Sequence, residues 1–327
     1  MPEVVTFGEA MIRLSPLGHQ RLEQAGTLDV AVGGSELNVA TGTSRLGLRS
    51  SWVSCLPDNP LGRMAAGAAQ RFGVDTSSIV WAPDQRMGLY WVEYGASPRA
   101  SSVLYDRADS AIARAPATAF DWPTILAGAR LFHTTGITAA LSPEASTAVR
   151  TALQVARRTG ALTSYDLNYR ARLWTEDEAR SCQEPLMEFV DILITTEEDA
   201  ARVFGIRGTD YADVARRLAE RFDLKVVTIT VRGDHSVLRN SWTALAWADG
   251  RLLEDRAYEI ELVDRVGGGD AYAAGFLFGY LTGDAAKGVR YGNAFSALKQ
   301  TSWSDLNYTT LREVEGLLAG SGTRISR

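Results

Sequence analysis

Three consecutive glycines followed by an aspartate, at residues 267–270, form the segment of this sequence best suited to chemistry. A strand-like run, 258–263, precedes them, and a helical pattern rich in small residues begins at Asp270. Consecutive glycines allow a tight turn that exposes backbone N–H groups at a helix N-terminus, and such a nest attracts phosphate oxygens. Asp270 beside that nest could accept the proton of an attacking hydroxyl group. The segment alone fits equally well a glycine-rich helix start capped by an aspartate.

The sequence gives little support for a Walker loop, a dinucleotide-binding fingerprint, a metal site or a disulfide framework. The glycines are not followed by Lys and Ser or Thr, as a Walker loop requires. They do not follow the first strand, as a dinucleotide fingerprint would. Cys55 and Cys182 have neither disulfide-framework nor metal-ligand spacing, and three scattered histidines leave little material for a zinc site or a histidine-based triad.

Composition places the chain among ordinary globular proteins. Its 327 residues are 46% hydrophobic and 22% charged, and 34 basic against 39 acidic residues give a net charge of −5. Without a basic tract, the chain has no electrostatic footprint for nucleic acid or an anionic membrane. Residues 1–6 lack the pattern of a signal peptide, and no apolar run reaches the roughly 20 residues that span a bilayer. These features predict a cytoplasmic protein without nucleic-acid or membrane partners.

The elements that must position the glycine turn alternate along the chain. Short apolar runs alternate with longer helical patterns, which predicts an α/β protein with a parallel sheet covered by helices. The predicted strands are 4–7, 52–56, 130–133, 162–165, 192–195 and 226–231. The predicted helices are 36–46, 61–72, 143–158, 196–204, 212–222, 270–281, 285–300 and 311–318.

Two segments interrupt this alternation, at about 11–32 and 87–110. The first has no helical period, and the second contains two β-like pieces, 88–94 and 101–105, that predict a hairpin. We expect a single domain over 1–327 in which these insertions form a small β-sheet lid over the main sheet. An exposed lid edge is a candidate surface for a homo-oligomer.

Two separated motifs resemble the signatures of the ribokinase-like (pfkB) carbohydrate kinases. Residues 264–270 (DRVGGGD) resemble the second signature, and residues 33–40 (GGSELNVA) resemble the first, in which two glycines precede an asparagine at a helix start. The resemblance covers essentially the whole chain. It implies a three-layer α/β/α ribokinase-like domain with a central, mostly parallel sheet and a β lid. It also implies ATP and Mg²⁺ as cofactors.

A narrower resemblance is to 2-keto-3-deoxygluconate kinases, carried by residues 8–9, 105–111, 166–170 with 173–174, 264–270, and 296–300 with 305–307. It implies ATP-dependent phosphorylation of the terminal hydroxyl of a sugar acid, giving the 6-phosphate. Two guanidinium groups from distant segments suit a carboxylate substrate, because arginine grips carboxylates with paired hydrogen bonds. The substrate-binding residues so implied are Gly33, Gly34, Asn38, Tyr90, Tyr105, Arg107, Arg170 and Asp305. Arg107 and Arg170 would bind the carboxylate, although ordinary surface roles for them stay open, as does a packing role for Tyr90.

The resemblance also implies the catalytic and nucleotide-binding residues. Asp270 would be the base, with Gly267, Gly268 and Gly269 stabilising the transferred group. The implied ATP-binding residues are Asn168, Arg232, Gly233, Gly267, Gly269 and Asn293. Where the family has Asn-x-x-Glu, this chain has Thr196 and Asp199. We therefore expect ATP oxygens to hold Mg²⁺, with Asp199 acting through water at most. Monovalent-cation activation, with Asp264 as a loop partner, stays open.

Three alternatives remain beside the sugar-acid kinase. The first is a kinase for a neutral sugar such as fructose or ribose. The second is a catalytically silent sugar-binding regulator, against which the retention of Asp270 and the three glycines argues. The third, a nicotinamide-dependent dehydrogenase, is disfavoured because no glycine fingerprint follows the first strand.

Overall fold

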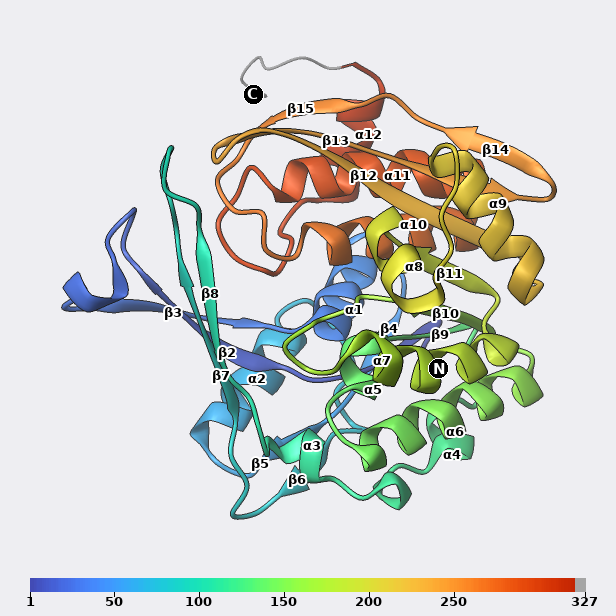
Figure 1. Cartoon of the computed structure of the whole chain (residues 1–327). Helices are drawn as coiled ribbons and strands as arrows, with labels where there is room; N and C mark the ends of the chain where they lie inside the picture. Colours follow the sequence, from blue (N-terminus) through green and yellow to red (C-terminus); the bar gives the residue numbers. More distant parts are fainter. Residues whose placement is uncertain (321–327) are drawn as a thin grey trace.

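A computed structural model describes residues 1–320, which fold around a nine-stranded sheet (Figure 1). The sheet has the order β14-β13-β12-β11-β10-β9-β1-β4, and β15 also pairs with β13. From β4 to β12 all neighbours are parallel, whereas β13, β14 and β15 join antiparallel. The strands are β1 (Val4–Phe7), β4 (Ser50–Val53), β9 (Leu131–Thr135), β10 (Leu162–Asp166), β11 (Ile192–Thr195), β12 (Val226–Ser236), β13 (Arg239–Ala248), β14 (Arg251–Glu254) and β15 (Tyr258–Glu261).

Helices cover both faces of this sheet. One face carries α1 (Ser35–Arg45), α10 (Gly268–Thr282), α11 (Ala285–Lys299) and α12 (Leu311–Leu318). The other carries α6 (Pro143–Thr159), α7 (Glu176–Gln183), α8 (Glu197–Phe204) and α9 (Tyr211–Phe222). Successive strand residues enter opposite cores, as Val4 and Val5 do. The strands lack polar alternation because both of their faces are buried.

Shorter elements complete the chain between these layers. They are α2 (Pro60–Gln70), α3 (Ala111–Arg114), α4 (Trp122–Ile125), α5 (Gly136–Ala139) and the 3₁₀ turns Leu22–Gln24, Ala117–Ala119 and Glu184–Phe189. None of the helices within residues 1–320 is long and apolar enough to cross a bilayer.

A second sheet of four strands, the lid, projects from one side of the molecule (Figure 1). Its order is β3-β2-β7-β8, built from β2 (Met11–Pro16), β3 (Leu28–Gly33), β7 (Gly88–Glu93) and β8 (Ser102–Asp106). β7 and β8 form the predicted antiparallel hairpin, and β2 and β3 come from the first inserted segment. The predicted α/β fold class, with a mostly parallel sheet and a β lid, is confirmed. That the whole chain is one domain stays a prediction.

Two strand predictions need correction. The predicted strand 52–56 is divided, because β4 ends at Val53 and Cys55–Pro57 form β5, which pairs with β6 (Val80–Ala82) in a separate sheet. Strands β13 and β14 were not predicted. The sequence of β13 contains three alanines, which are poor strand formers, and long-range pairing with β12 stabilises it instead.

Candidate active site

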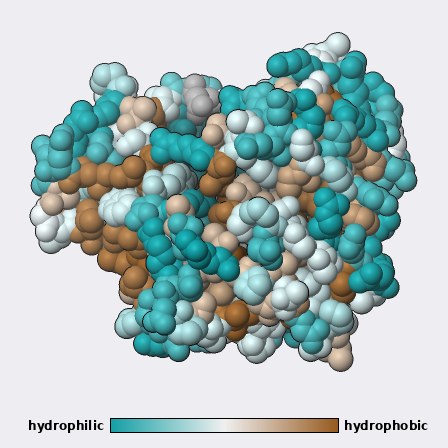
Figure 2. All heavy atoms as spheres, turned by 60° about the horizontal axis from the view of Figure 1, so that its bottom comes forward, coloured by the Kyte–Doolittle hydropathy of each residue, from teal (hydrophilic) through white to brown (hydrophobic). Residues whose placement is uncertain are grey.

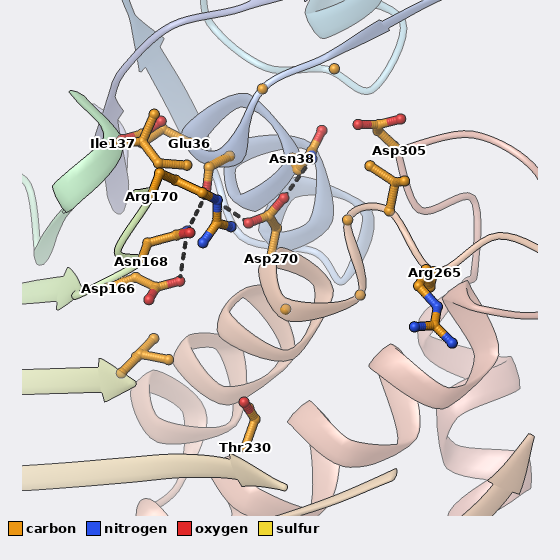
Figure 3. Close-up of a pocket in the computed structure, with 18 of the residues that line it drawn as sticks. Glu36, Asn38, Ile137, Asp166, Asn168, Arg170, Thr230, Arg265, Asp270 and Asp305 are labelled. Atoms are coloured by element: carbon orange, nitrogen blue, oxygen red, sulfur yellow. Dashed lines mark hydrogen bonds between the residues drawn. The ribbon is translucent and has the colours of Figure 1, made fainter. Parts of the chain in front are cut away.

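A cavity of about 370 Å³ lies between the lid and the carboxyl ends of the central strands (Figure 3). Its walls come from lid strands, the N-termini of α1 and α10, and the ends of β10, β11 and β12. Most of the residues predicted for the site line it: Gly33, Gly34, Asn38, Tyr90, Tyr105, Arg107, Asn168, Arg170, Asp199, Arg232, Gly267, Gly268, Gly269, Asp270 and Asp305. Gly233 and Asn293 do not.

The glycine turn forms the N-terminus of α10. Gly267 caps the helix with a φ of +81°, and a Cβ there would lie 2.5 Å from the carbonyl oxygen of Asp305, so only glycine fits. The N–H of Gly268 donates to the Arg265 carbonyl (3.1 Å) and is used inside the turn. The N–H groups of Gly267 and Gly269 find no acceptor within residues 1–320. Two unpaired N–H groups at the positive end of a helix dipole are suited to an anion.

Asp270 is held by α1 across the cavity. Its Oδ1 accepts from the Ser35 hydroxyl and its Oδ2 from the Asn38 amide, each at 2.6 Å (Figure 3). Burial raises the pKa of Asp270, while these two hydrogen bonds lower it. The pKa of Asp270 is raised overall, and the two hydrogen bonds orient the carboxylate and offset part of the effect of burial. Asn38 was predicted to bind sugar hydroxyls; its amide nitrogen donates to Asp270, and the sugar contact stays a prediction.

A second carboxylate, Asp305, lies at the lid side of the cavity. Its Oδ2 accepts from the Tyr90 hydroxyl at 2.6 Å, and Tyr90 stacks on Tyr105 with ring centroids 5.9 Å apart. A Cβ at Gly33 would lie 2.4 Å from both Asp305 Oδ2 and the Tyr90 hydroxyl. Backbone, carboxylate and phenol thus meet at one point, which suits recognition of several hydroxyl groups.

The two predicted arginines have different partners. Arg107 is ion-paired with the buried Glu9, which also accepts a hydrogen bond of 2.5 Å from Ser110. Arg170 is exposed, and its Nη1 donates to the Tyr169 carbonyl at 2.8 Å. Arg170 also lowers the pKa of Asp166, Asp199 and Asp270. Of these two arginines, Arg170 therefore offers its positive charge to a ligand more directly, because Glu9 balances Arg107.

Besides Glu9, two acidic residues of the cavity were not predicted as site residues. Asp166 ends β10, and its Oδ2 accepts from the Asn168 amide at 3.2 Å. Burial raises the pKa of Asp166 well above its ordinary value, with Asp270 and Asp199 adding to this effect. Glu36, in α1, is almost wholly buried and lines the same cavity. Both are neighbours of predicted residues in the sequence, and that proximity was the available signal.

The arrangement does not form a closed metal centre. Within residues 1–320, no three His, Cys, Asp or Glu side chains are grouped so as to hold a metal ion. Asp166 and Asp199 nevertheless line the cavity beside Asp270, and burial raises the pKa of Asp199 as well. Mg²⁺ binds proteins through one or two carboxylates and takes its other ligands from phosphates and water, so this donor set fits that ion.

The end of the cavity away from the lid follows β11 and β12. Thr195, Thr196 and Thr230 line it with Arg232, whose guanidinium lies 5.8 Å from the ring centroid of Trp242. Asn293, predicted to contact ATP, is buried in α11 and donates to Asp255 at 3.3 Å. Gly233 lies against Ser241, whose hydroxyl would be 2.4 Å from a Cβ there.

A lid over a mostly parallel sheet, with a fixed aspartate facing unpaired amides, is typical of sugar kinases of the ribokinase-like type. The sequence matches the family model described as pfkB family carbohydrate kinase over residues 1–306, and the chain belongs to that family. The predicted family membership and enzyme class, a carbohydrate kinase, are confirmed.

Individual relatives extend the match over nearly the whole chain. A 2-dehydro-3-deoxygalactonokinase from Haloferax volcanii is 40% identical, over 99% of this chain and 99% of its own length. The crystal structure of 2-dehydro-3-deoxygluconokinase from Thermotoga maritima has a TM-score of 0.94 and 44% identity, covering 97% of this chain and 98% of its own. A ribokinase II structure from E. coli, in complex with ATP and Mg²⁺, has a TM-score of 0.86 at 22% identity over 98% of this chain and all of its own, which supports the fold alone.

Proposed function

We propose that this protein transfers the γ-phosphoryl group of ATP to the terminal hydroxyl of 2-keto-3-deoxygluconate or its galactonate epimer. The observation that carries the proposal is Asp270, held on both oxygens by Ser35 and Asn38 and lying beside the unpaired amides of Gly267 and Gly269. Relatives at 40% and 44% identity that are named as kinases of these two acids support it.

In the proposed reaction, Asp270 takes the proton of the terminal hydroxyl as its oxygen attacks the γ-phosphorus, and ADP leaves. The N–H groups of Gly267 and Gly269 donate to the oxygens of the group in transit. Mg²⁺, when bound with ATP, neutralises phosphate charge, and Asp166 and Asp199 are the side chains that would hold its shell. Arg232 would bind phosphate at the far end.

The lid supplies the acceptor half of the proposed site. Tyr90, Tyr105 and Gly33 come from its strands, and Asp305 meets them from the C-terminal part of the chain. A polyol lying there would be covered by the lid, and excluding water in this way would limit wasteful ATP hydrolysis.

The preference for an acid rests on Arg170. We expect Arg170→Ala to lower kcat/KM roughly 10- to 100-fold for 2-keto-3-deoxy sugar acids but only about threefold or less for neutral sugars, because only the acids offer a carboxylate to the guanidinium. An ATP-consumption assay over a panel of sugars and sugar acids measures this. Arg63→Ala, an exposed arginine of α2 paired with Asp58, is the control and should behave as wild type.

The same panel separates the rivals. A higher kcat/KM for fructose or ribose than for any acid would replace the proposal with a neutral-sugar kinase. Tight sugar binding by calorimetry without phosphate transfer would indicate a silent regulator.

Repeating the assay in potassium and in tetramethylammonium salts tests monovalent-cation activation. At the loop of Asp264, for which that activation was left open, Lys299 Nζ donates to the Asp264 carbonyl at 2.9 Å.

We also propose that two copies associate through the outer face of the lid. Val30, Leu14, Trp91 and Leu104 are paired neighbours in four successive strands and therefore form one apolar row across that face. Val30 and Leu104 are 52% and 54% exposed. Apolar residues gather on the lid side of the surface in Figure 2.

A further inference from the structure

Four buried charged residues form a cluster directly behind the acceptor end of the cavity. They are Arg13 of lid strand β2, Asp264 and Asp305 of the loops on either side of α10 and α11, and Lys299 of α11. None is more than 4% exposed. Two positive and two negative charges balance, as buried charges must if the fold is to be stable.

Arg13 is the centre of this cluster. Its Nη1 donates to Asp264 Oδ2 at 2.8 Å and to Asp305 Oδ1 at 2.5 Å, so one nitrogen joins two carboxylates that are 41 positions apart in the sequence. Its Nε donates to Ser15 at 3.2 Å, and the rings of Tyr94 and Trp303 lie 5.4 and 5.2 Å from the guanidinium carbon. Burial lowers the pKa of Arg13, but the ion pairs with Asp305 and Asp264 help to raise it above its ordinary value, so Arg13 stays charged.

Asp264 links Arg13 to the glycine turn, because its carboxylate contacts both. Its Oδ1 accepts from the Val266 N–H at 2.9 Å, and its Oδ2 also accepts from the Ser304 N–H at 3.2 Å. Its carbonyl oxygen accepts from Lys299. The residue is therefore fixed at carboxylate and backbone, and the turn that presents the amides of Gly267 and Gly269 begins immediately after it.

Asp305 links Arg13 to the acceptor end of the cavity, because its carboxylate contacts both Arg13 and Tyr90. Arg13 occupies its Oδ1 and the Tyr90 hydroxyl its Oδ2, while its carbonyl oxygen lies against Gly267. Each carboxylate oxygen has a further lone pair, so Asp305 can still accept a hydrogen bond from a substrate hydroxyl. Arg13 itself does not line the cavity.

We propose that Arg13 is a positioning residue that fixes the phosphate-binding turn, through Asp264, and the acceptor-binding carboxylate, through Asp305, relative to each other. This inference rests on the proposed function, because it assigns Asp305 to the acceptor and the turn to the phosphoryl group.

Arg13→Lys tests the proposal because it keeps a cation but lacks the planar guanidinium. We expect kcat/KM for the acceptor to fall roughly 10- to 100-fold, since small misplacements of reacting groups have effects of this size. The dissociation constant for ADP, measured by calorimetry, should stay within about twofold of wild type, because ADP lacks the γ-phosphoryl group that the turn would hold. A loss below about threefold in kcat/KM, or an equal loss in ADP affinity, would overturn the proposal.

Amide hydrogen exchange gives a readout that needs no acceptor and so stands apart from the identity of the substrate. In Arg13→Lys, residues 262–270 and 302–307 should exchange at least about tenfold faster, whereas β9, β10 and β11 should be unchanged. Arg157→Lys is the control, because Arg157 also pairs with a buried carboxylate, Asp191, but outside the cavity. Unchanged exchange in 262–270 would overturn the positioning role even if sugar acids prove to be substrates.

Asp264→Asn decides the matter if Arg13→Lys does not fold. The amide oxygen of the substituted side chain can still accept from the Val266 N–H, but the ion pair with Arg13 is lost. The same two changes, lower acceptor kcat/KM and faster exchange in 262–270, are expected at smaller size. Wild-type kinetics and exchange in this variant would contradict the proposal. A wild-type enzyme that phosphorylates no sugar acid contradicts the proposed function only, since the exchange result does not depend on it.

Discussion

At the scale of single residues, the sequence predicted Asp270 as the candidate base but not the side chains that hold it. Asp270 could be inferred because an aspartate after a glycine turn is a local pattern. The hydrogen bond from Ser35 joins residues 235 positions apart, and the ion pair of Arg107 with Glu9 joins residues 98 apart. Such contacts depend on how the strands are ordered in the sheet, which a local pattern does not specify.

Ser35 should set the pH dependence of the reaction. Its hydroxyl lowers the pKa of Asp270, which burial raises, so Ser35→Ala should raise that pKa further. A base must be ionised to act, so the acid limb of kcat/KM should move upward by about one pH unit, the size expected for one hydrogen bond to a charged group. A pH–rate profile of the acceptor reaction measures the shift.

Two further variants serve as references for the pH–rate profile, one as a control and one that removes the proposed base. Ser44→Ala removes a hydroxyl of the same helix that donates to the Phe72 carbonyl at 2.6 Å, away from the cavity, and should leave the limb in place. Asp270→Asn should lower turnover roughly 10²- to 10⁴-fold. Equal limbs for wild type and Ser35→Ala would show that Ser35 does not tune the base.

At the scale of elements, most of the buried scaffold was predictable. The strand Ile192–Thr195 and the helix Leu311–Leu318 have the predicted bounds, because a continuous apolar run and a helical period are local signals. The nucleotide side was less predictable. Asn293 lies within a predicted helix, but the sequence does not show that this helix turns the residue toward Asp255 rather than into the cavity.

The N-terminal turn of α1 should make stability depend on pH. Glu36 Oε1 accepts from the Thr135 N–H and from the hydroxyls of Thr135 and Thr138, at 2.7 to 3.0 Å. Burial nevertheless raises its pKa from 4.5 to about 7. Between these values the folded protein binds a proton that the unfolded chain has released, so the free energy of unfolding should fall as pH rises and level off above about pH 7. At 1.36 kcal/mol per unit, the loss is at most about 3 kcal/mol.

Glu36→Gln tests this dependence, because the amide does not titrate. Urea unfolding at several values between pH 4.5 and 8 should show that the stability difference between variant and wild type grows in favour of the variant as pH rises. Taking the difference removes the contribution of other titrating groups. A difference that stays constant over this range would contradict the assignment to Glu36.

At the scale of the whole molecule, the predicted lid and three-layer body are both present. The proposed dimer would cover the outer face of the lid. We expect a dimer in sedimentation velocity at micromolar concentration. Val30→Glu or Leu104→Glu should weaken it at least about tenfold, because each places a charge in the apolar row. Leu252→Glu, on the exposed strand β14, is the control and should leave the dimer intact. A monomeric wild-type protein at these concentrations would refute the proposed interface.

The way the lid is joined to the body has a consequence for protein engineering. Only Gly8, Glu9 and Ala10 separate β1 of the central sheet from β2 of the lid, and only Gly34 separates β3 from α1. The lid therefore has no linker at which it could be cut out and exchanged as a separate module. A chimaera that receives this lid also receives Arg13, Gly33, Tyr90 and Tyr105. The residues proposed to select the acceptor and the strands that cover the site would therefore be transferred together. Changing the acceptor selectivity while keeping the covering strands requires point substitutions in the lid rather than exchange of the whole lid.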